Sequence, residues 1–209
     1  MTATDYARAT RLLSRRDPVL RTLVRKYGPC RMASHQHTEP FQALVHAIIS
    51  QQLSTKAAAT IAARFTSLFP GGFPVPAQVA ATPDATLRGV GLSGQKLGYL
   101  RDLCQRIESG ALPLDAIEAM PDEEVIASLT QVKGIGTWTA EMFLMFRLHR
   151  PDVLPVGDLG IVKAIQQQYR LRKTPKPERL LQIGEAWRPY RSVACWYLWR
   201  SLENTPMKD

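Results

Sequence analysis

A turn that holds two glycines is the first feature of this 209-residue chain whose residue types and spacing could do chemistry. The stretch 129–140 reads Leu-Thr-Gln-Val-Lys-Gly-Ile-Gly-Thr-Trp-Thr-Ala, with helical patterns on both sides of the turn. Gly134 and Gly136 allow unusual backbone angles and a close neighbour. Their N–H groups, with those that open the next helix, form a site for an anion such as phosphate. Lys133 adds positive charge, and Ile135 should point inward and fix the turn. A plain helix corner with glycine caps is the alternative.

An aspartate stands about twenty residues further along the chain, where another helix is expected to begin. The loop 150–157 reads Arg-Pro-Asp-Val-Leu-Pro-Val-Gly, and Asp158 precedes the apolar pattern that starts at Leu159. The positive end of a helix and its free N–H groups favour a charged carboxylate there. Because capping is the commonest task of aspartate at a helix start, capping and catalysis both remain open. The competing Asp152 is expected to be a loop residue.

Together, the two-glycine turn, the loop and Asp158 resemble the helix-hairpin-helix motif, the Gly/Pro-rich loop and the aspartate of the HhH-GPD superfamily of DNA repair glycosylases. The resemblance covers residues 38–203, approximately. Many relatives read Pro-Val-Asp-Asp-Leu-Gly, whereas this chain has Gly157 before Asp158. The retained second position is the one that the family uses for catalysis. The resemblance therefore implies Asp158 as the catalytic residue. It also implies that the hairpin residues bind DNA, namely Lys133, Gly134, Ile135, Gly136 and Thr137.

The reaction that the resemblance implies can run with one carboxylate. Cleavage of an N-glycosidic bond makes the deoxyribose cation-like at its anomeric carbon, and a carboxylate under the sugar stabilises that charge. An alkylated purine such as 3-methyladenine already carries positive charge, so it departs without a dedicated general acid. The paired acids of ordinary glycosidases are therefore not required.

The residue two positions after the second hairpin glycine distinguishes branches of the family. Members with lyase activity carry a lysine there, which forms a Schiff base with the sugar, whereas this chain has Trp138. The resemblance thus implies a monofunctional hydrolase of the 3-methyladenine DNA glycosylase II branch. In that branch the indole stacks on a cationic base. Trp199 matches a second pocket aromatic, and Met142 is expected to line the same pocket. A buried core aromatic is the alternative for each tryptophan.

The segment 41–57 resembles the same branch. An apolar helix ends in Ser-Gln-Gln-Leu-Ser before another helix, which Ser54 is expected to cap. The family inserts a side chain from this turn into the duplex to fill the gap left by the flipped base. Leu53 is the expected wedge, Gln52 is expected beside it in the minor groove, and Ser54 belongs to the same DNA contact. A buried leucine with helix caps is the alternative. The glycine turn 89–96 is a candidate for a second phosphate contact.

Helices must position all of these residues, because apolar residues recur at three- and four-residue spacing while alternating runs are nearly absent. The predicted class is all-α. The expected helices span approximately 5–15, 18–27, 40–50, 54–69, 93–108, 121–131, 137–148, 159–170, 177–187 and 190–203. The resemblance implies two helical lobes flanking a DNA-binding cleft, with lobe one near 1–40 plus 150–209 and lobe two near 41–149. The N-terminal α+β domain of larger members is expected to be missing.

The charge of the chain favours a polyanionic partner, since the formal net charge is +9 and the pI is near 9.8. Eight Lys and Arg residues lie between Met1 and Arg31, against Asp5 and Asp17 only. A solvated helix face, a phosphate contact and a mitochondrial presequence are all compatible with this stretch.

The remaining composition narrows the class of protein. Cys30, Cys104 and Cys195 are too scattered for an iron–sulfur cluster or a zinc site, and indicate a reduced, intracellular protein. His35 and His37 lack acidic or thiol partners nearby, so a surface loop is expected rather than a metal site. No apolar run reaches the roughly 18–20 residues that cross a bilayer.

These features predict a monofunctional DNA glycosylase that removes alkylated bases of the 3-methyladenine type by base flipping and leaves an abasic site for base excision repair. The expected partner is damaged double-stranded DNA, with no membrane and a monomeric chain. The expected location is the cytoplasm or nucleoid of a bacterium or the nucleus of a eukaryote. No cofactor is expected, and a monovalent cation at the hairpin carbonyls stays open. A non-catalytic DNA-binding relative and a glycosylase for another lesion are the alternatives; a bifunctional glycosylase/lyase is the third.

Overall fold

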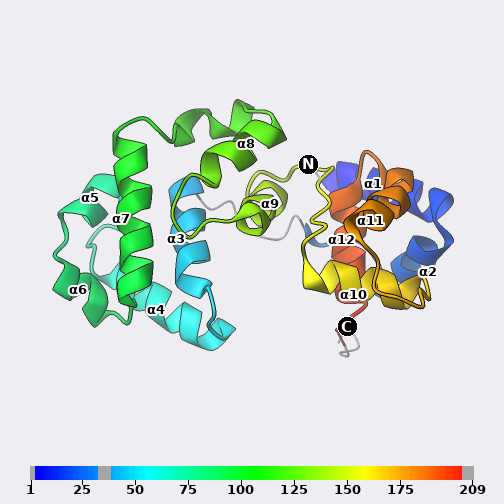
Figure 1. Cartoon of the computed structure of the whole chain (residues 1–209), viewed down its shortest axis with the longest axis horizontal. Coiled ribbons are helices and arrows are strands. Elements are labelled where there is room, and N and C mark those ends of the chain that lie inside the picture. The colour runs from blue at the N-terminus through cyan, green and yellow to red at the C-terminus, as the bar shows by residue number, and fades with distance from the viewer. Residues whose placement is uncertain (1–2, 33–38, 204–209) are drawn as a thin grey trace. The chain divides into compact units, whose positions relative to one another are not determined.

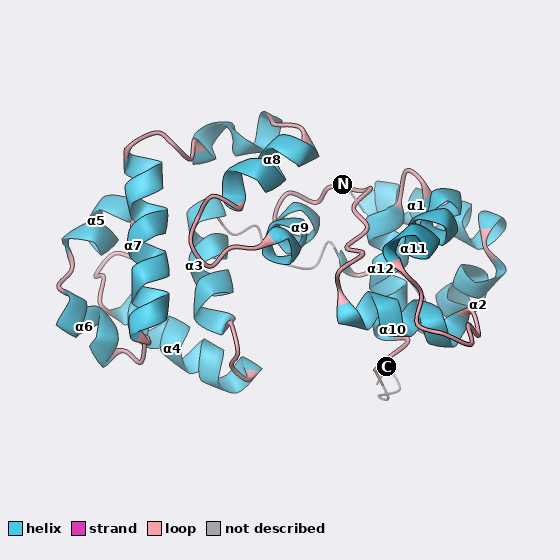
Figure 2. Cartoon of the chain, viewed as in Figure 1, coloured by secondary structure: helices cyan, strands magenta, loops and turns pink. Residues whose placement is uncertain are grey.

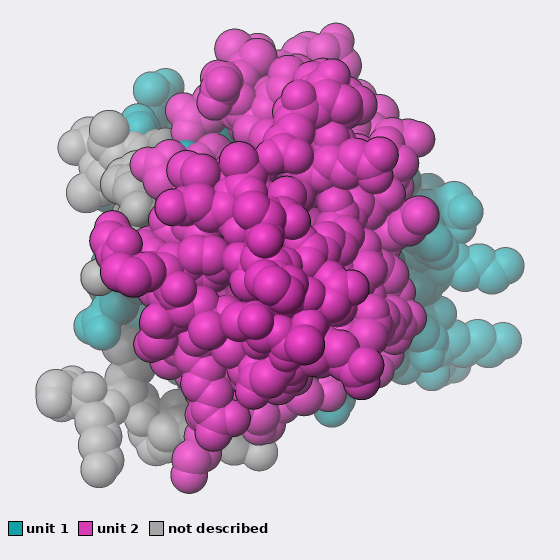
Figure 3. Space-filling model, turned by 90° about the vertical axis from the view of Figure 1, so that its left-hand side faces the viewer, with its two compact units in different colours: residues 1–36, 144–209 teal, residues 37–143 magenta. Residues whose placement is uncertain are grey.

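The computed structural model describes residues 3–32 and 39–203, and over these ranges it holds helices and no strand (Figures 1 and 2). The all-α class predicted from the periodicity is therefore confirmed. The chain divides into two compact units: unit 1 comprises residues 1–36 and 144–209, and unit 2 comprises residues 37–143 (Figure 3).

Unit 2 is built around the helix α7, which packs against α3, α5 and α6. Four buried residues of α7, Leu97, Leu100, Leu103 and Cys104, recur at helical spacing and form one apolar stripe. Burial of each leucine stabilises the fold by about 1.5–3 kcal/mol. The helices are α3 (Pro40–Ser50), α4 (Thr55–Ser67), α5 (Pro76–Ala81), α6 (Asp84–Gly89), α7 (Gly94–Glu108), the 3-10 helix η2 (Leu114–Ala119), α8 (Asp122–Leu129) and α9 (Thr137–Phe146), and the boundary between the units falls within α9.

The two six-residue helices α5 and α6 were not among the expected helices. They are too short to show an apolar period, and prolines flank them in the sequence. A tertiary contact stabilises both short helices. Arg101 of α7 donates to the carbonyl oxygens of Val79, Ala80 and Thr82, and its guanidinium pairs with Asp84. These bonds satisfy the carbonyl end of α5 and tie α6 to it.

Unit 1 is held by α12, which packs against α1, α2 and α10. Residues on several sides of α12 are buried, namely Ser192, Val193, Ala194, Cys195, Tyr197 and Leu198, so this helix forms the middle of the unit. The helices of unit 1 are α1 (Ala3–Arg16), α2 (Pro18–Tyr27), α10 (Leu159–Gln168), α11 (Pro177–Gly184), the 3-10 helix η3 (Glu185–Trp187) and α12 (Arg191–Arg200).

A buried carboxylate joins the early and late parts of unit 1. Asp17 caps α2, because its Oδ1 accepts from the N–H groups of Val19 at 2.8 Å and Leu20 at 3.1 Å. Its Oδ2 accepts from the hydroxyl of Tyr169 and from Nε1 of Trp187, the latter at 2.9 Å. Burial and this carboxylate both raise the pKa of Tyr169, which keeps the phenol protonated as a donor.

Candidate functional site

The two-glycine hairpin of unit 2 connects α8 to α9. Its first position must be glycine because of the backbone angle there and a neighbouring side chain. Gly134 has φ +82°, and a Cβ atom there would lie 2.2 Å from Cδ2 of Tyr99 on α7. Gly136 has an ordinary φ, and a Cβ there would meet no atom within 4 Å. Ile135 is 3% exposed, which confirms that it points inward. The hairpin thus packs against the Tyr99 ring at Gly134, whereas the space beside Gly136 is unoccupied by protein atoms in the described part of the chain.

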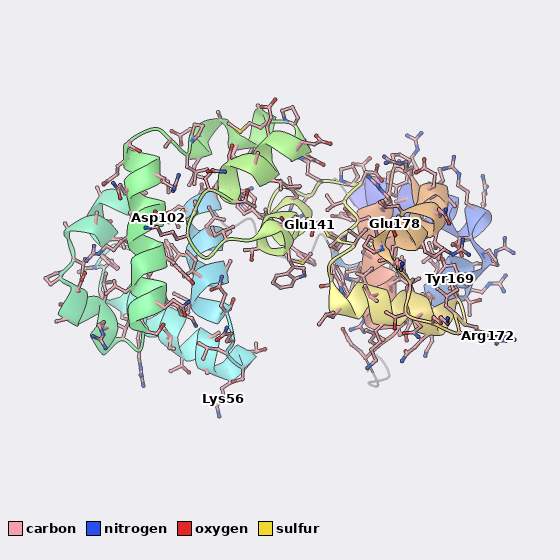
Figure 4. The ribbon with its side chains drawn as sticks, in the orientation of Figure 1. Lys56, Asp102, Glu141, Tyr169, Arg172 and Glu178 are labelled. Atoms are coloured by element: carbon pink, nitrogen blue, oxygen red, sulfur yellow. The ribbon has the colours of Figure 1, made fainter. Side chains whose placement is uncertain are left out.

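Two further side chains fix the hairpin from neighbouring elements of unit 2. Asp102 of α7 (Figure 4) accepts through Oδ2 from the N–H of Lys133 at 2.9 Å and from Nε of Arg106 at 2.8 Å. Burial by itself would raise the pKa of Asp102, but these donors and the two cations hold it below its usual value. Gln51, at the end of α3, donates from Nε2 to the carbonyl oxygen of Gly134 at 2.8 Å.

The turn between α3 and α4 presents two exposed side chains. Gln52 lies in the left-handed region with φ +56°, and Leu53 is 38% exposed. The alternative of a buried leucine is therefore wrong. Ser54 caps α4 as expected, with its hydroxyl accepting from the N–H of Ala57 at 3.3 Å. Lys96 of α7 stabilises this turn, because its Nζ donates to the carbonyl oxygens of Ile49 and Gln51.

The same lysine is the last residue of the glycine turn 89–96, the candidate for a second phosphate contact. Gly91 has φ +108°, and Ser93 caps α7 by accepting from the N–H of Lys96 at 3.2 Å. The Lys96 ammonium is directed to the α3 carbonyls, and desolvation lowers its pKa. Lys96 therefore binds carbonyl groups within unit 2, and the phosphate contact at this turn stays a prediction.

Two residues expected in a base pocket lie on one face of α9. Trp138, in the first turn, is 52% exposed, so the alternative of a buried core aromatic is wrong for it. Met142 follows four residues later and is half-buried. The exposed indole of Trp138 leaves an apolar, electron-rich surface available to a ligand.

The carboxylate site lies in unit 1, at the start of α10. Asp158 caps this helix, with Oδ1 accepting from the N–H of Ile161 at 2.7 Å. The same oxygen accepts from Nε1 of Trp199 at 2.9 Å. The residue Asp158 is 9% exposed. Trp199 is half-buried, and its ring stacks on Phe146 with a centroid distance of 5.9 Å and an interplanar angle of 30°. Two donors on this one oxygen thus orient the carboxyl group.

Gly160 leaves the space that this arrangement needs. A Cβ atom there would lie 3.0 Å from Oδ1 of Asp158 and 3.1 Å from Cδ1 of Trp199. Any larger residue would press on both the carboxylate and the indole. Sequence reasoning did not single out this glycine, nor Tyr99, Asp102 and Gln51. The sequence Asp-Leu-Gly that begins at Asp158 was the available signal for Gly160.

Asp152, the competing aspartate of the same loop, has a structural role. Both oxygens of Asp152 are bound by arginines: Oδ1 accepts from Nε of Arg191 at 2.8 Å, and Oδ2 accepts from Nη1 of Arg188 at 2.9 Å. Arg191 also donates to the backbone carbonyl of Asp152 at 2.7 Å. Asp152 therefore fastens its loop to the start of α12, as a loop residue.

The other candidate chemical groups do not gather into a site. No group of three or more His, Cys, Asp or Glu side chains suited to a metal occurs within residues 3–32 and 39–203. His35 and His37 lie outside the described residues. His46 is half-buried on α3 and packs edge-on against Phe73, and desolvation lowers its pKa.

The three cysteines are free thiols. Burial raises the pKa of Cys30 to about 11 and that of Cys104 to about 12, so neither favours the reactive thiolate. No helix in the described part of the chain is long and apolar enough to span a bilayer.

The chain is similar to known DNA repair proteins. Residues 45–189 match the family described as HhH-GPD superfamily base excision DNA repair protein. DNA-3-methyladenine glycosylase 1 of Schizosaccharomyces pombe is 39% identical over 181 residues, which are 86% of this chain and 78% of that protein. The alkylbase DNA glycosidase-like protein mag2 of the same organism is 33% identical over 199 residues, which are 94% of this chain and 93% of the length of mag2.

Solved structures agree with the sequence matches. The S. pombe 3-methyladenine DNA glycosylase Mag1 in complex with abasic DNA has a TM-score of 0.81 and 36% identity, covering 97% of this chain and 100% of its own. The DNA-3-methyladenine glycosidase of Bacillus halodurans has a TM-score of 0.75 and 38% identity, with 90% of both chains covered. This chain belongs to the HhH-GPD superfamily of base excision DNA repair proteins.

Proposed function

We propose that this chain is a monofunctional 3-methyladenine DNA glycosylase, which flips an alkylated base out of duplex DNA, hydrolyses its N-glycosidic bond and leaves an abasic site for base excision repair. The observation that carries the proposal is the carboxylate of Asp158, whose Oδ1 is held by the Ile161 N–H and the Trp199 indole at the start of a helix. The S. pombe glycosylase 1, its solved structure and the B. halodurans protein support the substrate class, because their names describe 3-methyladenine glycosylases.

Asp158 supplies negative charge to the sugar in this mechanism. As the glycosidic bond breaks, positive charge develops on the deoxyribose, and a fixed carboxylate stabilises that transition state more than the ground state. The two donors on Oδ1 hold the group in place, so little reorganisation is needed during the reaction. The cationic base leaves with the electrons of the broken bond and becomes neutral. Water adds to the cation-like anomeric carbon and loses a proton to the solvent, which leaves the abasic sugar with a hydroxyl group.

Trp138, Met142 and Trp199 are proposed to receive the flipped base. A cationic base is attracted to the negative face of an indole, an interaction of about 0.5–2 kcal/mol that a neutral base makes more weakly. The exposure of Trp138 supports this role. Because a tryptophan stands where lyase members carry a lysine, no Schiff base with the sugar is expected from this position.

The hairpin 133–137 is proposed to bind the DNA backbone, and the turn 52–54 to enter the duplex. The open space at Gly136 supports close approach of a phosphate to the backbone N–H groups. Leu53 as wedge, with Gln52 beside it, is supported by the exposure of both side chains. The hairpin carbonyls of Val132, Gly134 and Gly136 accept protein hydrogen bonds, and no step of the mechanism uses a cation there.

The protein is proposed to act as a monomer, inside the cell where its DNA substrate lies. The three free thiols support a reducing compartment. Whether that compartment is a bacterial cytoplasm or a nucleus does not alter the mechanism.

A panel of duplexes, each with one defined lesion, tests the proposed function through the release of free base. The wild type is expected to release 3-methyladenine, and Asp158→Asn is expected to release it at least ~100-fold more slowly, since it loses a charge stabilising the transition state. Both should bind abasic duplex with similar affinity, because phosphate contacts supply most of it. Equal, negligible release by both proteins would instead indicate a non-catalytic DNA-binding relative. Borohydride trapping of a protein–DNA adduct would contradict the monofunctional assignment.

A further inference from the structure

The net positive charge of the chain lies in one of its two units. Unit 1 contains 20 Lys and Arg residues against 8 Asp and Glu residues, a formal charge of +12. Unit 2 contains 7 Lys and Arg residues against 10 Asp and Glu residues, a formal charge of −3. The hairpin therefore belongs to a unit of negative net charge, and the net long-range attraction of the chain to DNA comes from unit 1.

Part of this charge lies at the corner between α1 and α2. Arg15, Arg16 and Arg21 flank the corner, and all three are exposed. Nε of Arg21 donates to the carbonyl oxygen of Ser14 at 2.7 Å, which holds α2 against the end of α1. The acid within this corner, Asp17, is 5% exposed and binds donors of the protein interior. The outer surface of the corner is therefore cationic.

A second basic segment reaches the same corner from the connection between α10 and α11. Tyr169, at the end of α10, donates to Asp17 and thereby fixes the start of this connection at the corner (Figure 4). Three basic residues follow within four positions, and all three are exposed: Arg170, Arg172 and Lys173. The corner cluster consists of Arg15, Arg16, Arg21, Arg170, Arg172 and Lys173.

No acid neutralises the corner cluster in the described residues. In unit 1, Asp152 pairs with Arg188 and Arg191, Glu185 pairs with Arg188, and Glu203 pairs with Arg200, and none of these ion pairs includes a cluster residue. Five of the six cluster residues are arginines, whose planar guanidinium groups bind phosphate oxygens in a bidentate manner. Two of these guanidinium groups also donate to protein carbonyls, Arg16 to Arg188 at 2.6 Å and Arg21 to Ser14 at 2.7 Å. Because no acid neutralises them, the set has the chemistry of a phosphate-backbone contact.

We propose that the corner cluster is a second DNA contact, which binds the phosphate backbone of duplex DNA whether or not a lesion is present. The choice of DNA as the polyanion rests on the proposed function. The cluster would supply much of the non-specific affinity and its salt dependence, while the hairpin of the acidic unit 2 sets the register on the backbone.

Neutralising substitutions test the corner cluster against a matched pair in unit 2. Arg15→Gln with Arg172→Gln removes two charges from the cluster, and Arg64→Gln with Arg88→Gln removes two exposed charges from unit 2. For an undamaged duplex of about 30 base pairs, the cluster variant should lose about tenfold in affinity at ~0.1 M salt. Its slope of log K against log salt should become shallower by about 1–2, since each phosphate contact contributes about 0.9. The control pair should lose less than about twofold. A charge-conserving pair, Arg15→Lys with Arg172→Lys, should retain the slope.

Three results would overturn the proposal. Equal losses in the two neutralised variants would mean that only net charge matters, and an unchanged slope in the cluster variant would mean that no phosphate is bound there. The third is a cluster variant that loses binding to phosphatidylserine vesicles while its duplex affinity stays intact, which would assign the surface to a membrane. Base release is measured separately: absence of free base from the wild type would refute the proposed function and leave the salt slopes interpretable.

Discussion

At the scale of single residues, the bond between Trp199 and Asp158 gives the tryptophan a positioning task in addition to any stacking on the base. Trp199→Phe removes the donor but keeps an aromatic ring beside Phe146. A hydrogen bond to a charged group contributes about 1.5–3 kcal/mol, so single-turnover excision should slow by roughly 10–100-fold at saturating DNA. The matched control is Trp196→Phe on the same helix, whose ring contacts Tyr197. Equal rates in both variants, at equal melting temperature, would rule out the positioning task.

Gly160 allows a second test at this scale, with opposite effects on stability and activity. Alanine in the first turn of α10 would gain helix propensity of up to about 1 kcal/mol. Its Cβ, however, would lie 3.0 Å from Oδ1 of Asp158. Gly160→Ala should therefore keep or raise the melting temperature while excision falls by about tenfold or more. Gly157→Ala, which meets no atom within 4 Å, should behave like the wild type. Normal excision by Gly160→Ala would show that the carboxylate tolerates displacement.

What the sequence could predict at this scale was the local part of each site. The start of a helix at Asp158 and the inward position of Ile135 follow from patterns a few residues long, and the structure has both. The contact of Trp199 with Asp158 spans 41 residues, and no local pattern encodes such a pair. The same holds for Tyr99 beneath Gly134, since only the packing of α7 reveals why that position must be glycine.

At the scale of elements, the two hairpin glycines should fail in different ways. Gly134→Ala forces a side chain into a left-handed conformation and against the Tyr99 ring, which should cost at least about 1–3 kcal/mol of unfolding free energy. Gly136→Ala meets open space and should leave stability nearly unchanged, while its methyl group hinders a phosphate at the backbone N–H groups. Urea unfolding and the affinity for abasic duplex measure the two effects. Full DNA affinity in Gly136→Ala would place the phosphate elsewhere.

The helices themselves were predicted where they are long enough to show a period. Helices such as α2 and α3 have the expected bounds, 18–27 and 40–50. The missed helices α5 and α6 depend on Arg101, whose guanidinium binds carbonyls and a carboxylate on both of them. A helix stabilised by a tertiary hydrogen bond leaves little trace in its own six residues.

At the scale of the whole molecule, the integrity of unit 1 depends on the buried carboxylate of Asp17. It accepts two backbone N–H groups of α2, the Tyr169 hydroxyl and the Trp187 indole, so it joins segments separated by 152 and 170 residues. Asp17→Asn would present an N–H₂ group to at least one of these donors and leave a buried polar group unsatisfied. The expected loss is about 2–4 kcal/mol of unfolding free energy, seen as a lower urea midpoint.

A matched control in the same unit separates this effect from the mere loss of a charge. Glu203→Gln breaks an exposed pair with Arg200, and exposed pairs contribute about 0–1 kcal/mol. Asp17→Asn should still excise 3-methyladenine well below its melting temperature, because Asp17 orders the unit and takes no part in the reaction. If the two variants unfolded at the same urea concentration, the Asp17 network would contribute nothing beyond a surface pair. The coherence of unit 1 would then have to come from the apolar packing around α12 alone.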